Sequence, residues 1–237
     1  MTGAEVLLVV LLAAAGATVQ GSIGIGYALV AGPGLAAIDT AFVPGPLLLI
    51  GLVVGARHIF VEFGDIDRPA VGRCFLGLPF GLVAGLAVLN AMDDRLLGIA
   101  VGATTALAAT VMLLGLRVRR TPAVEVAAGA ATAFSAVTAA LPGPPFVAAF
   151  SDLQPAAMRS TASLYIGSFI LIALVPLAAT GNFGGHELRL LAVLVPGTFG
   201  GLLLARFVRP MLERPWFRPL ILVVAGMGGI ALVLRNL

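Results

Sequence analysis

The sequence predicts an all-α polytopic membrane protein built from two inverted repeats, each a broken or re-entrant helical hairpin plus three transmembrane helices. Three observations predict this fold: the composition, two interrupted apolar segments at corresponding places in the halves, and the distribution of arginine. Of the 237 residues, 60% are hydrophobic and 11% are charged, whereas soluble domains carry about 25% charged residues. The composition therefore excludes a soluble domain.

Eight apolar segments cover most of the chain, and short polar turns separate most of them. Crossing a bilayer core takes about 20 apolar residues, and most of the segments reach this length. They span residues 4–38, 43–63, 72–90, 96–116, 123–150, 156–180, 188–208 and 216–234. We expect Met1–Gln20 to be a retained span, because it lacks the basic start and the small-residue cleavage site of a leader peptide.

Two of these segments, 4–38 and 123–150, contain residues that interrupt helices. The first has a glycine-rich stretch from Gln20 to Gly26 and then Gly32-Pro33-Gly34, and the second has Leu141-Pro142-Gly143-Pro144-Pro145. Proline removes a backbone donor and glycine lowers helix stability. Both segments are predicted to be broken helices or hairpins, which lipid tolerates only where protein or a water-filled cavity satisfies the backbone.

The interrupted segments occupy equivalent places in a duplicated sequence. At an offset of 113 residues, Gly16 matches Gly129, Ser22 matches Ser135 and Asp39 matches Asp152. At an offset of 117 residues, Gly64 matches Gly181 and Pro79 matches Pro196. We expect a first transmembrane repeat over residues 1–120 and a second over residues 121–237, together forming one integral-membrane domain.

The arginines distinguish two topologies. All 14 basic side chains apart from histidine are arginine. If all eight segments cross once, the arginines divide eight against six. If each interrupted segment returns to its own side, one face holds eleven of them, at 57, 68, 73, 117, 119, 120, 159, 206, 209, 214 and 218, and the other holds only 95, 189 and 235. The second division fits the positive-inside rule; a chance distribution of the charges is the alternative.

This second topology places both termini outside and relates the halves by an in-plane pseudo-twofold axis, a common plan of secondary transporters. A half-helix that ends inside the membrane exposes N–H groups and the positive end of its dipole, so it can bind an anion. We expect a midplane site for a small oxyanion between the two breaks. Its candidate residues are Gln20, Ser22, Gly24 and Gly26 in the first break, and Ser135, Thr138, Gly143 and Pro144 in the second. The alternative is that glycine and proline only allow close helix packing.

Other polar residues are weaker candidates. Arg159 follows the second break, where its guanidinium can pair with an anion or can simply lie at the interface. Tyr27, Arg57, His58 and Tyr165 are candidates for lining the cavity. The sequence has one cysteine and two separated histidines, which offer no metal cluster and no disulfide framework. Neither a metal nor a cofactor is therefore expected.

Several motifs resemble a known family. Gly21-Ser22-Ile23-Gly24-Ile25-Gly26, followed by Gly32-Pro33-Gly34-Leu35, resembles the first glycine-rich signature of the sulfite exporter TauE/SafE family. Gly143-Pro144-Pro145, followed by Met158 to Leu164, resembles the signature of the family's second half. The stretch from Arg57-His58 to Asp67 resembles the family's loop after the span that follows the first signature. The resemblance covers nearly the whole chain. It implies transport of small sulfur-containing anions, such as sulfite, thiosulfate or organosulfonates, by a multi-pass protein of the bacterial inner membrane.

The residues favour a carrier over an enzyme. An intramembrane enzyme needs a nucleophile with a base, paired aspartates or a metal cluster, and the sequence offers none of these near the breaks. We expect alternating access, with the two repeats rocking around the anion site and without a proton relay of the Asp/Glu type. A passive anion channel and an accessory subunit of a larger membrane complex are the alternatives. The lipid bilayer and a small anion are the expected partners, and no nucleic acid is expected.

Overall fold

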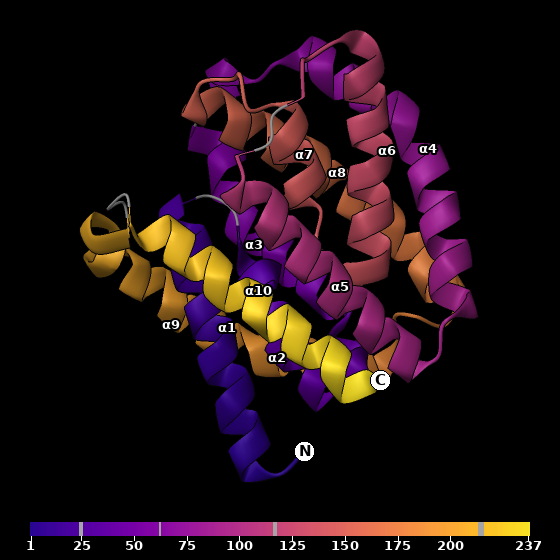
Figure 1. The fold of residues 1–237 in the computed structure, drawn as a ribbon, viewed down its shortest axis with the longest axis vertical. Helices are drawn as coiled ribbons and strands as arrows, with labels where there is room; N and C mark the ends of the chain where they lie inside the picture. Colours follow the sequence, from indigo (N-terminus) through magenta and orange to yellow (C-terminus); the bar gives the residue numbers. More distant parts are fainter. Residues whose placement is uncertain (24–25, 62, 116–117, 213–215) are drawn as a thin grey trace.

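The structure, a computed structural model, describes residues 1–23, 26–61, 63–115, 118–212 and 216–237 (Figure 1). The side chains of residues 23, 57–61, 63, 209–212 and 218 lie outside this description. The described chain is helical throughout and contains no strand, which confirms the predicted all-α fold. Its elements are α1 (Gly3–Ile23), α2 (Tyr27–Ile38), η1 (Thr40–Phe42), α3 (Gly45–Val61), η2 (Phe63–Asp65), α4 (Arg68–Ala91), α5 (Asp94–Leu113), α6 (Pro122–Ala139), α7 (Gly143–Ala149), α8 (Pro155–Ala179), α9 (Gly185–Leu212) and α10 (Phe217–Asn236).

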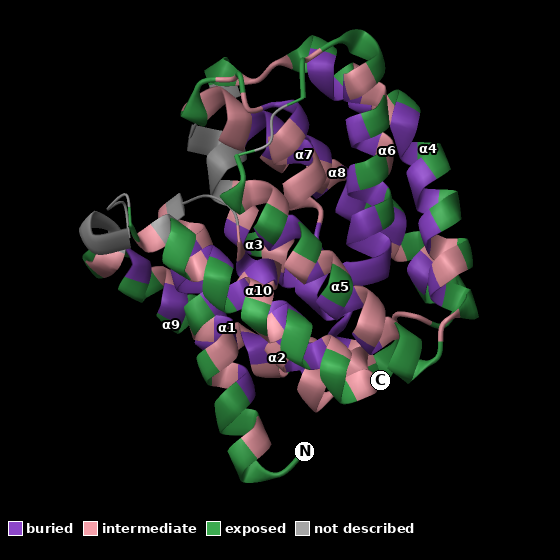
Figure 2. Ribbon diagram, in the orientation of Figure 1, coloured by how far each residue is buried: buried purple, intermediate pink, exposed green. Residues whose placement is uncertain are grey.

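Seven of the described helices are long and apolar enough to cross a membrane, namely α1, α4, α5, α6, α8, α9 and α10. Their outward sides carry large apolar residues: Phe80 is 73% exposed and Phe207 is 80% exposed. Figure 2 shows exposed and buried faces alternating along α4, α5 and α10. A soluble protein rarely exposes so much apolar surface, whereas lipid tails cover it without cost. The chain is a multi-pass membrane protein.

The first interrupted segment folds into a helical hairpin. Helix α1 ends at Ile23, and α2 begins after Gly26, whose φ of 120° favours glycine. Helix α2 then runs back along α1, because Gly16 lies against Ala31 and Gly34 lies against Leu12. The chain therefore turns near the inner end of α1 and returns toward the face from which it came.

Gly32-Pro33-Gly34, which the sequence predicted as a further interruption, lies inside α2 instead. All three residues belong to a continuous helix, and Pro33 is buried. Proline removes one helical hydrogen bond without ending the helix here, because α1 packs closely on this side: a Cβ on Gly34 would lie 2.8 Å from Leu12 Cδ1. Gly34 thus serves close packing of α2 on α1.

The second interrupted segment is also a hairpin, with a shorter returning arm. Helix α6 ends at Ala139 and is capped by Ala140, which has a left-handed φ of 54°. The N–H of Val118 donates a hydrogen bond of 3.3 Å to the carbonyl oxygen of Ala148. Because Val118 precedes α6 and Ala148 lies near the end of α7, the returning arm comes back to the start of α6.

Three helix pairs pack so closely that their backbones touch. A Cβ added to any of the glycines at these contacts would overlap backbone atoms of the partner helix, as happens where small residues let membrane helices approach. The glycines are Gly77, Gly81 and Gly129 between α4 and α6, Gly197 and Gly201 between α1 and α9, and Gly102 and Gly229 between α5 and α10. Each pair joins a helix from residues 1–120 to a helix from residues 121–237.

Side-chain contacts gather the loops into two groups at opposite ends of the bundle. At one end, Asp39 lies 3.2 Å from His186 Nε2, and the Arg235 guanidinium donates to the carbonyl of Ala37. At the other end, Arg120 contacts Asp67 and Asp152. We call the second end, where helices α3, α5, α7 and α9 end, the arginine-rich face, and the first end the opposite face. The grouping agrees with a topology in which each interrupted segment returns to its own side; the division into repeats at residue 120 stays a prediction.

Candidate functional site

A cavity of about 130 Å³ lies between the two helix breaks. One buried water needs about 10–15 Å³ of such space, so the cavity has room for a small anion or for several waters. Residues from both hairpins, from α3 and from α8 form most of its wall. Along α8, which spans Pro155–Ala179, the wall extends from Ala162 to Ile170. The cavity therefore lies near the middle of the bundle's depth.

At the first break, the Gln20 side chain connects three elements beside the cavity. Its Oε1 accepts a hydrogen bond of 3.0 Å from the N–H of Tyr27, the first residue of α2, and its Nε2 lies 3.4 Å from the carbonyl oxygen of Gly51 on α3. Gln20, Gly26 and Tyr27 all line the cavity. The N-terminus of α2, with the positive end of its dipole, thus lies at the cavity wall.

The aromatic ring of Tyr27 anchors the start of α2 in the protein interior. Tyr27 is 1% exposed, and its hydroxyl forms a hydrogen bond of 3.0 Å with the Thr198 hydroxyl on α9. Because this polar group already has a partner, Tyr27 contributes its backbone and ring to the cavity wall, and its hydroxyl is directed to α9.

At the second break, Gly143 and Pro144 line the cavity, as the sequence predicted for the site. A Cβ on Gly143 would have no atom within 4 Å, so this residue borders open space. Pro144 and Pro145 have no N–H group, which removes two of the donors that a helix N-terminus normally offers. Helix α7 therefore presents fewer amide donors to the cavity than α2 does.

Helices α3 and α8 supply cavity residues that the sequence reasoning missed. Gly51 and Gly55 on α3, and Ser163 and Gly167 on α8, all line the cavity. On each helix the two residues are four positions apart, so they share one face. A signal was present in the sequence: the two pairs are related by a constant offset of 112 residues, close to the offset of the duplicated positions.

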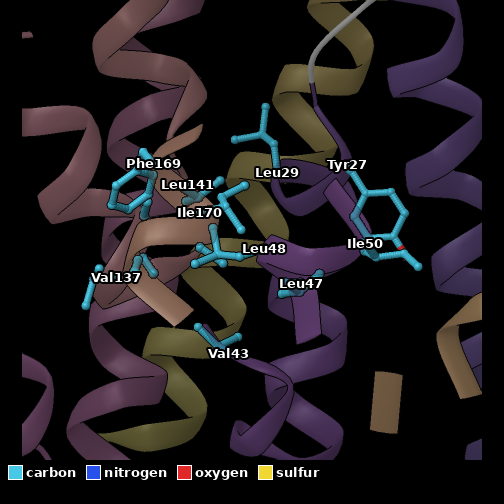
Figure 3. Close-up of a cluster of buried hydrophobic side chains, with 14 of the residues drawn as sticks. Tyr27, Leu29, Val43, Leu47, Leu48, Ile50, Val137, Leu141, Phe169 and Ile170 are labelled. Atoms are coloured by element: carbon cyan, nitrogen blue, oxygen red, sulfur yellow. The ribbon is translucent and has the colours of Figure 1, made fainter. Parts of the chain in front are cut away.

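On the side of the opposite face, large apolar side chains form the cavity wall. Leu48 of α3, Leu141 of the second break and Ile170 of α8 come together there (Figure 3), and each is at most 3% exposed. Toward the arginine-rich face, the wall includes Met112 near the end of α5 and Leu222 near the start of α10. The cavity wall thus has apolar residues on both sides of the breaks.

Four predicted site residues lie outside the cavity wall, because their hydroxyl groups are bonded to backbone carbonyls elsewhere. The bonds run from Ser22 to Thr18 (2.8 Å), from Thr138 to Phe134 (2.9 Å), from Ser135 to Leu141 (2.9 Å) and from Tyr165 to Gly129 (2.8 Å). The Ser135 bond holds the end of α6 to the second break, and the Tyr165 bond joins α8 to α6. These residues position the elements around the cavity.

Four other candidates are not placed at the cavity. Gly24 and the side chains of Arg57 and His58 lie outside the described residues. Arg159 is half-buried in the second turn of α8, close to the arginine-rich face, and does not belong to the cavity wall. Its position corresponds to the interface rather than to the middle of the bundle.

Among the described residues that line the cavity, none is aspartate, glutamate, arginine or histidine. Charged groups concentrate at the arginine-rich face, where Arg120 also contacts Glu125, a residue 2% exposed. Burial favours a higher pKa for Asp67, but hydrogen bonds from Arg120 and from the Ala70 N–H hold this pKa below its usual value. In the described part of the chain, no three His, Cys, Asp or Glu side chains are placed to hold a metal ion.

Comparison with known families agrees with the sequence motifs. A family model described as sulfite exporter TauE/SafE matches residues 8–232. The chain belongs to the sulfite exporter TauE/SafE family. The matched region of this TauE/SafE protein includes both helix breaks and the cavity wall, and membership makes it a membrane transport protein. A comparison with curated proteins found no match, and a comparison with solved structures found none either.

Proposed function

We propose that this TauE/SafE protein carries a small sulfur-containing anion, such as sulfite, thiosulfate or an organosulfonate, across the bacterial inner membrane. One observation supports the proposal most strongly: a cavity at mid-depth is bounded by both helix breaks and by no charged side chain among its described lining residues. Family membership supplies the substrate class. Broken helices around a midplane site are the usual architecture of secondary transporters.

The chemistry of the wall favours an anion over a cation. Cation sites need oxygen ligands, commonly carboxylates, and no carboxylate lines the described wall. The N-terminus of α2 instead directs the positive end of a helix dipole at the cavity. Without a fixed positive charge, the site would hold an anion weakly enough to release it, as transport requires.

The mechanism that fits this arrangement is alternating access. Leu48, Leu141 and Ile170 form the cavity wall on the side of the opposite face, and Met112 and Leu222 form it on the side of the arginine-rich face. In this mechanism one of these two groups of side chains separates while the other comes together. The arginine-rich face is the cytoplasmic one by the positive-inside rule.

The pairing of helices supports an inverted repeat as the basis of this exchange. Helix α1 packs on α9 as α6 packs on α4, and α3 packs on α8. In chain order, α1 and α6 occupy the same place in the two halves, and so do α4 and α9. The first two contacts are therefore counterparts, and the third joins two equivalent helices. A pseudo-twofold axis in the membrane plane would produce this pattern, and it would allow the two end states to be related by exchange of roles between the halves.

The test is transport by the purified protein in proteoliposomes. We expect uptake of radiolabelled sulfite or thiosulfate that saturates with concentration and follows the substrate gradient, with sulfoacetate and taurine as competing substrates to define the class. Because no Asp or Glu lines the described wall, we expect pH to act through the protonation state of the substrate. Conductance that does not saturate would indicate that the protein is a passive channel. The absence of any flux would favour an accessory subunit of a larger membrane complex.

A further inference from the structure

We propose that Ser163 contacts the transported anion, its hydroxyl donating a hydrogen bond to one anion oxygen while the Gln20 amide donates to another. The inference rests on the proposed transport function and names the donors of that site. It requires a substrate with at least two acceptor oxygens, as sulfite, thiosulfate and sulfonates have.

The inventory of polar side chains at the cavity is short. Among the described lining residues, only Gln20, Tyr27 and Ser163 have polar side chains. The hydroxyl of Tyr27 is bonded to Thr198 on α9. Gln20 on α1 and Ser163 on α8 are therefore the side chains left to offer donors to a bound ligand.

Ser163 lines the cavity with a hydroxyl group that has no partner in the described part of the chain, whereas Thr132, whose hydroxyl also lacks a partner, lies away from the cavity wall. In an apolar interior a serine normally donates to the carbonyl one turn earlier on its own helix, and Ser160 does so, with a hydrogen bond of 3.0 Å to the Ala156 oxygen. Ser163 is half-buried on the same helix, and its hydroxyl makes no hydrogen bond within the described part of the chain. An unpaired hydroxyl in this setting costs free energy, which a ligand or a water in the cavity would recover.

Gly55 leaves space in front of this hydroxyl. A Cβ at Gly55 would lie 3.8 Å from the Oγ of Ser163, and apart from the neighbouring backbone of its own helix no other atom would be within 4 Å of it. Helix α3 thus faces the Ser163 hydroxyl with a hydrogen atom in place of a side chain. A larger residue at this position would cover the donor.

Gln20 is held in an orientation that leaves a donor available. Its Oε1 accepts from the Tyr27 N–H, which fixes the direction of the amide plane. The Nε2 group has two hydrogens, and the single acceptor near it is the Gly51 carbonyl at 3.4 Å. The second hydrogen can therefore donate to a ligand from the wall formed by the first hairpin, and the Ser163 hydroxyl can donate from the wall formed by α8.

The test compares Ser163→Ala with Ser168→Ala, a serine on the same helix that does not line the cavity. A hydrogen bond to a charged group contributes enough binding free energy that its loss should raise the KM for sulfite about tenfold. We expect this rise for Ser163→Ala with little change in maximal rate, recovery toward the wild-type KM for Ser163→Thr, and no change for Ser168→Ala.

The outcomes separate this inference from the proposed function. If the wild-type protein transports sulfur oxyanions saturably and Ser163→Ala keeps the wild-type KM, Ser163 is not a ligand and the transport function stands. A Ser163→Ala protein that loses maximal rate at unchanged KM would also overturn the inference, because that pattern indicates a structural role. If the wild type moves no sulfur oxyanion, the proposed function fails and the inference fails with it.

Discussion

One guanidinium group joins four parts of the chain at the arginine-rich face. Arg120 contacts Asp67 before α4, Glu125 on α6 and Asp152 after α7, and its Cζ lies 5.1 Å from the centroid of the Phe150 ring. Glu125 also pairs with Arg73 on α4. Removing one partner of a buried ion pair leaves an uncompensated charge, so this network ties the base of the second hairpin to α4.

We expect Asp67→Asn to lower the thermal stability of the detergent-solubilised protein at neutral pH, by about 1–2 kcal/mol for a partly buried pair. Asparagine keeps a side-chain oxygen that can accept from the Ala70 N–H at the start of α4, so the substitution mainly removes the charge. The control is Asp65→Asn, in the exposed η2 turn. The measurement is the unfolding temperature as a function of pH.

The pH dependence follows from the lowered pKa of Asp67. A carboxyl whose pKa is lower in the folded state stabilises the protein above the unfolded pKa, about 3.9 for aspartate, and this contribution disappears as the pH falls through the folded value. The difference between wild type and Asp67→Asn should be largest at neutral pH and shrink below about pH 4. An equal difference at every pH would show that the charge of Asp67 contributes nothing.

At the scale of helices, local sequence chemistry located the breaks and several residues of the cavity wall. Glycine and proline act on the backbone where they stand, so the predicted breaks bring Gln20, Gly26, Gly143 and Pro144 to the cavity wall, while their role as ligands stays a prediction. A hydroxyl group can donate either to a ligand or to a nearby backbone carbonyl, and the sequence does not show which of the two it does. Ser135 was therefore predicted as a ligand, whereas its bond goes to the Leu141 carbonyl.

The contribution of α3 and α8 was missed because the offset of 112 residues between their small residues does not show what those residues do. Small residues four positions apart are equally typical of tight helix packing and of a cavity wall. Gly77 and Gly81 on α4 have the same spacing as Gly51 and Gly55 on α3, yet the first pair contacts the backbone of α6. Only the three-dimensional arrangement separates the two uses.

Gly81→Ala tests whether the α4–α6 contact needs a residue without a side chain. A Cβ at Gly81 would overlap the carbonyl of Ala130 on α6, so we expect a loss of about 2 kcal/mol or more from overpacking. Gly72→Ala on the same helix is the control, because Gly72 is exposed and has no atom near its Cβ position. Unfolding temperature and monodispersity in detergent report the result, and equal behaviour of the two variants would contradict a close α4–α6 contact.

At the scale of the whole molecule, the tightest contacts run between the two halves of the sequence. The pairs α1–α9, α4–α6 and α5–α10 each join residues 1–120 to residues 121–237. Rocking of the two halves as separate rigid bodies would pull apart interfaces in which backbones touch. If the protein works by the proposed alternating access, we expect α1 to move together with α9 and α4 to move together with α6.

The topology makes a prediction about sidedness. In a Cys74→Ala background, cysteines introduced at Asp39 and at Asp152 should react with a membrane-impermeant thiol reagent from opposite sides of the membrane. Asp39 lies with His186 at the opposite face, and Asp152 lies with Arg120 at the arginine-rich face. Labelling of both positions from the same side would contradict the inverted topology, but it would not affect the family assignment.

The most direct test of the central claim, that the cavity between the breaks is the transport site, is sulfite uptake into proteoliposomes by Gly143→Leu. A side chain at Gly143 enters open space beside the second break, so it should fill the cavity without disturbing the fold. Gly200→Leu, at an exposed position of α9 with no neighbouring atom, is the matched control. The account predicts uptake at background level for Gly143→Leu and at the wild-type level for Gly200→Leu; wild-type uptake by a correctly inserted Gly143→Leu protein would contradict it.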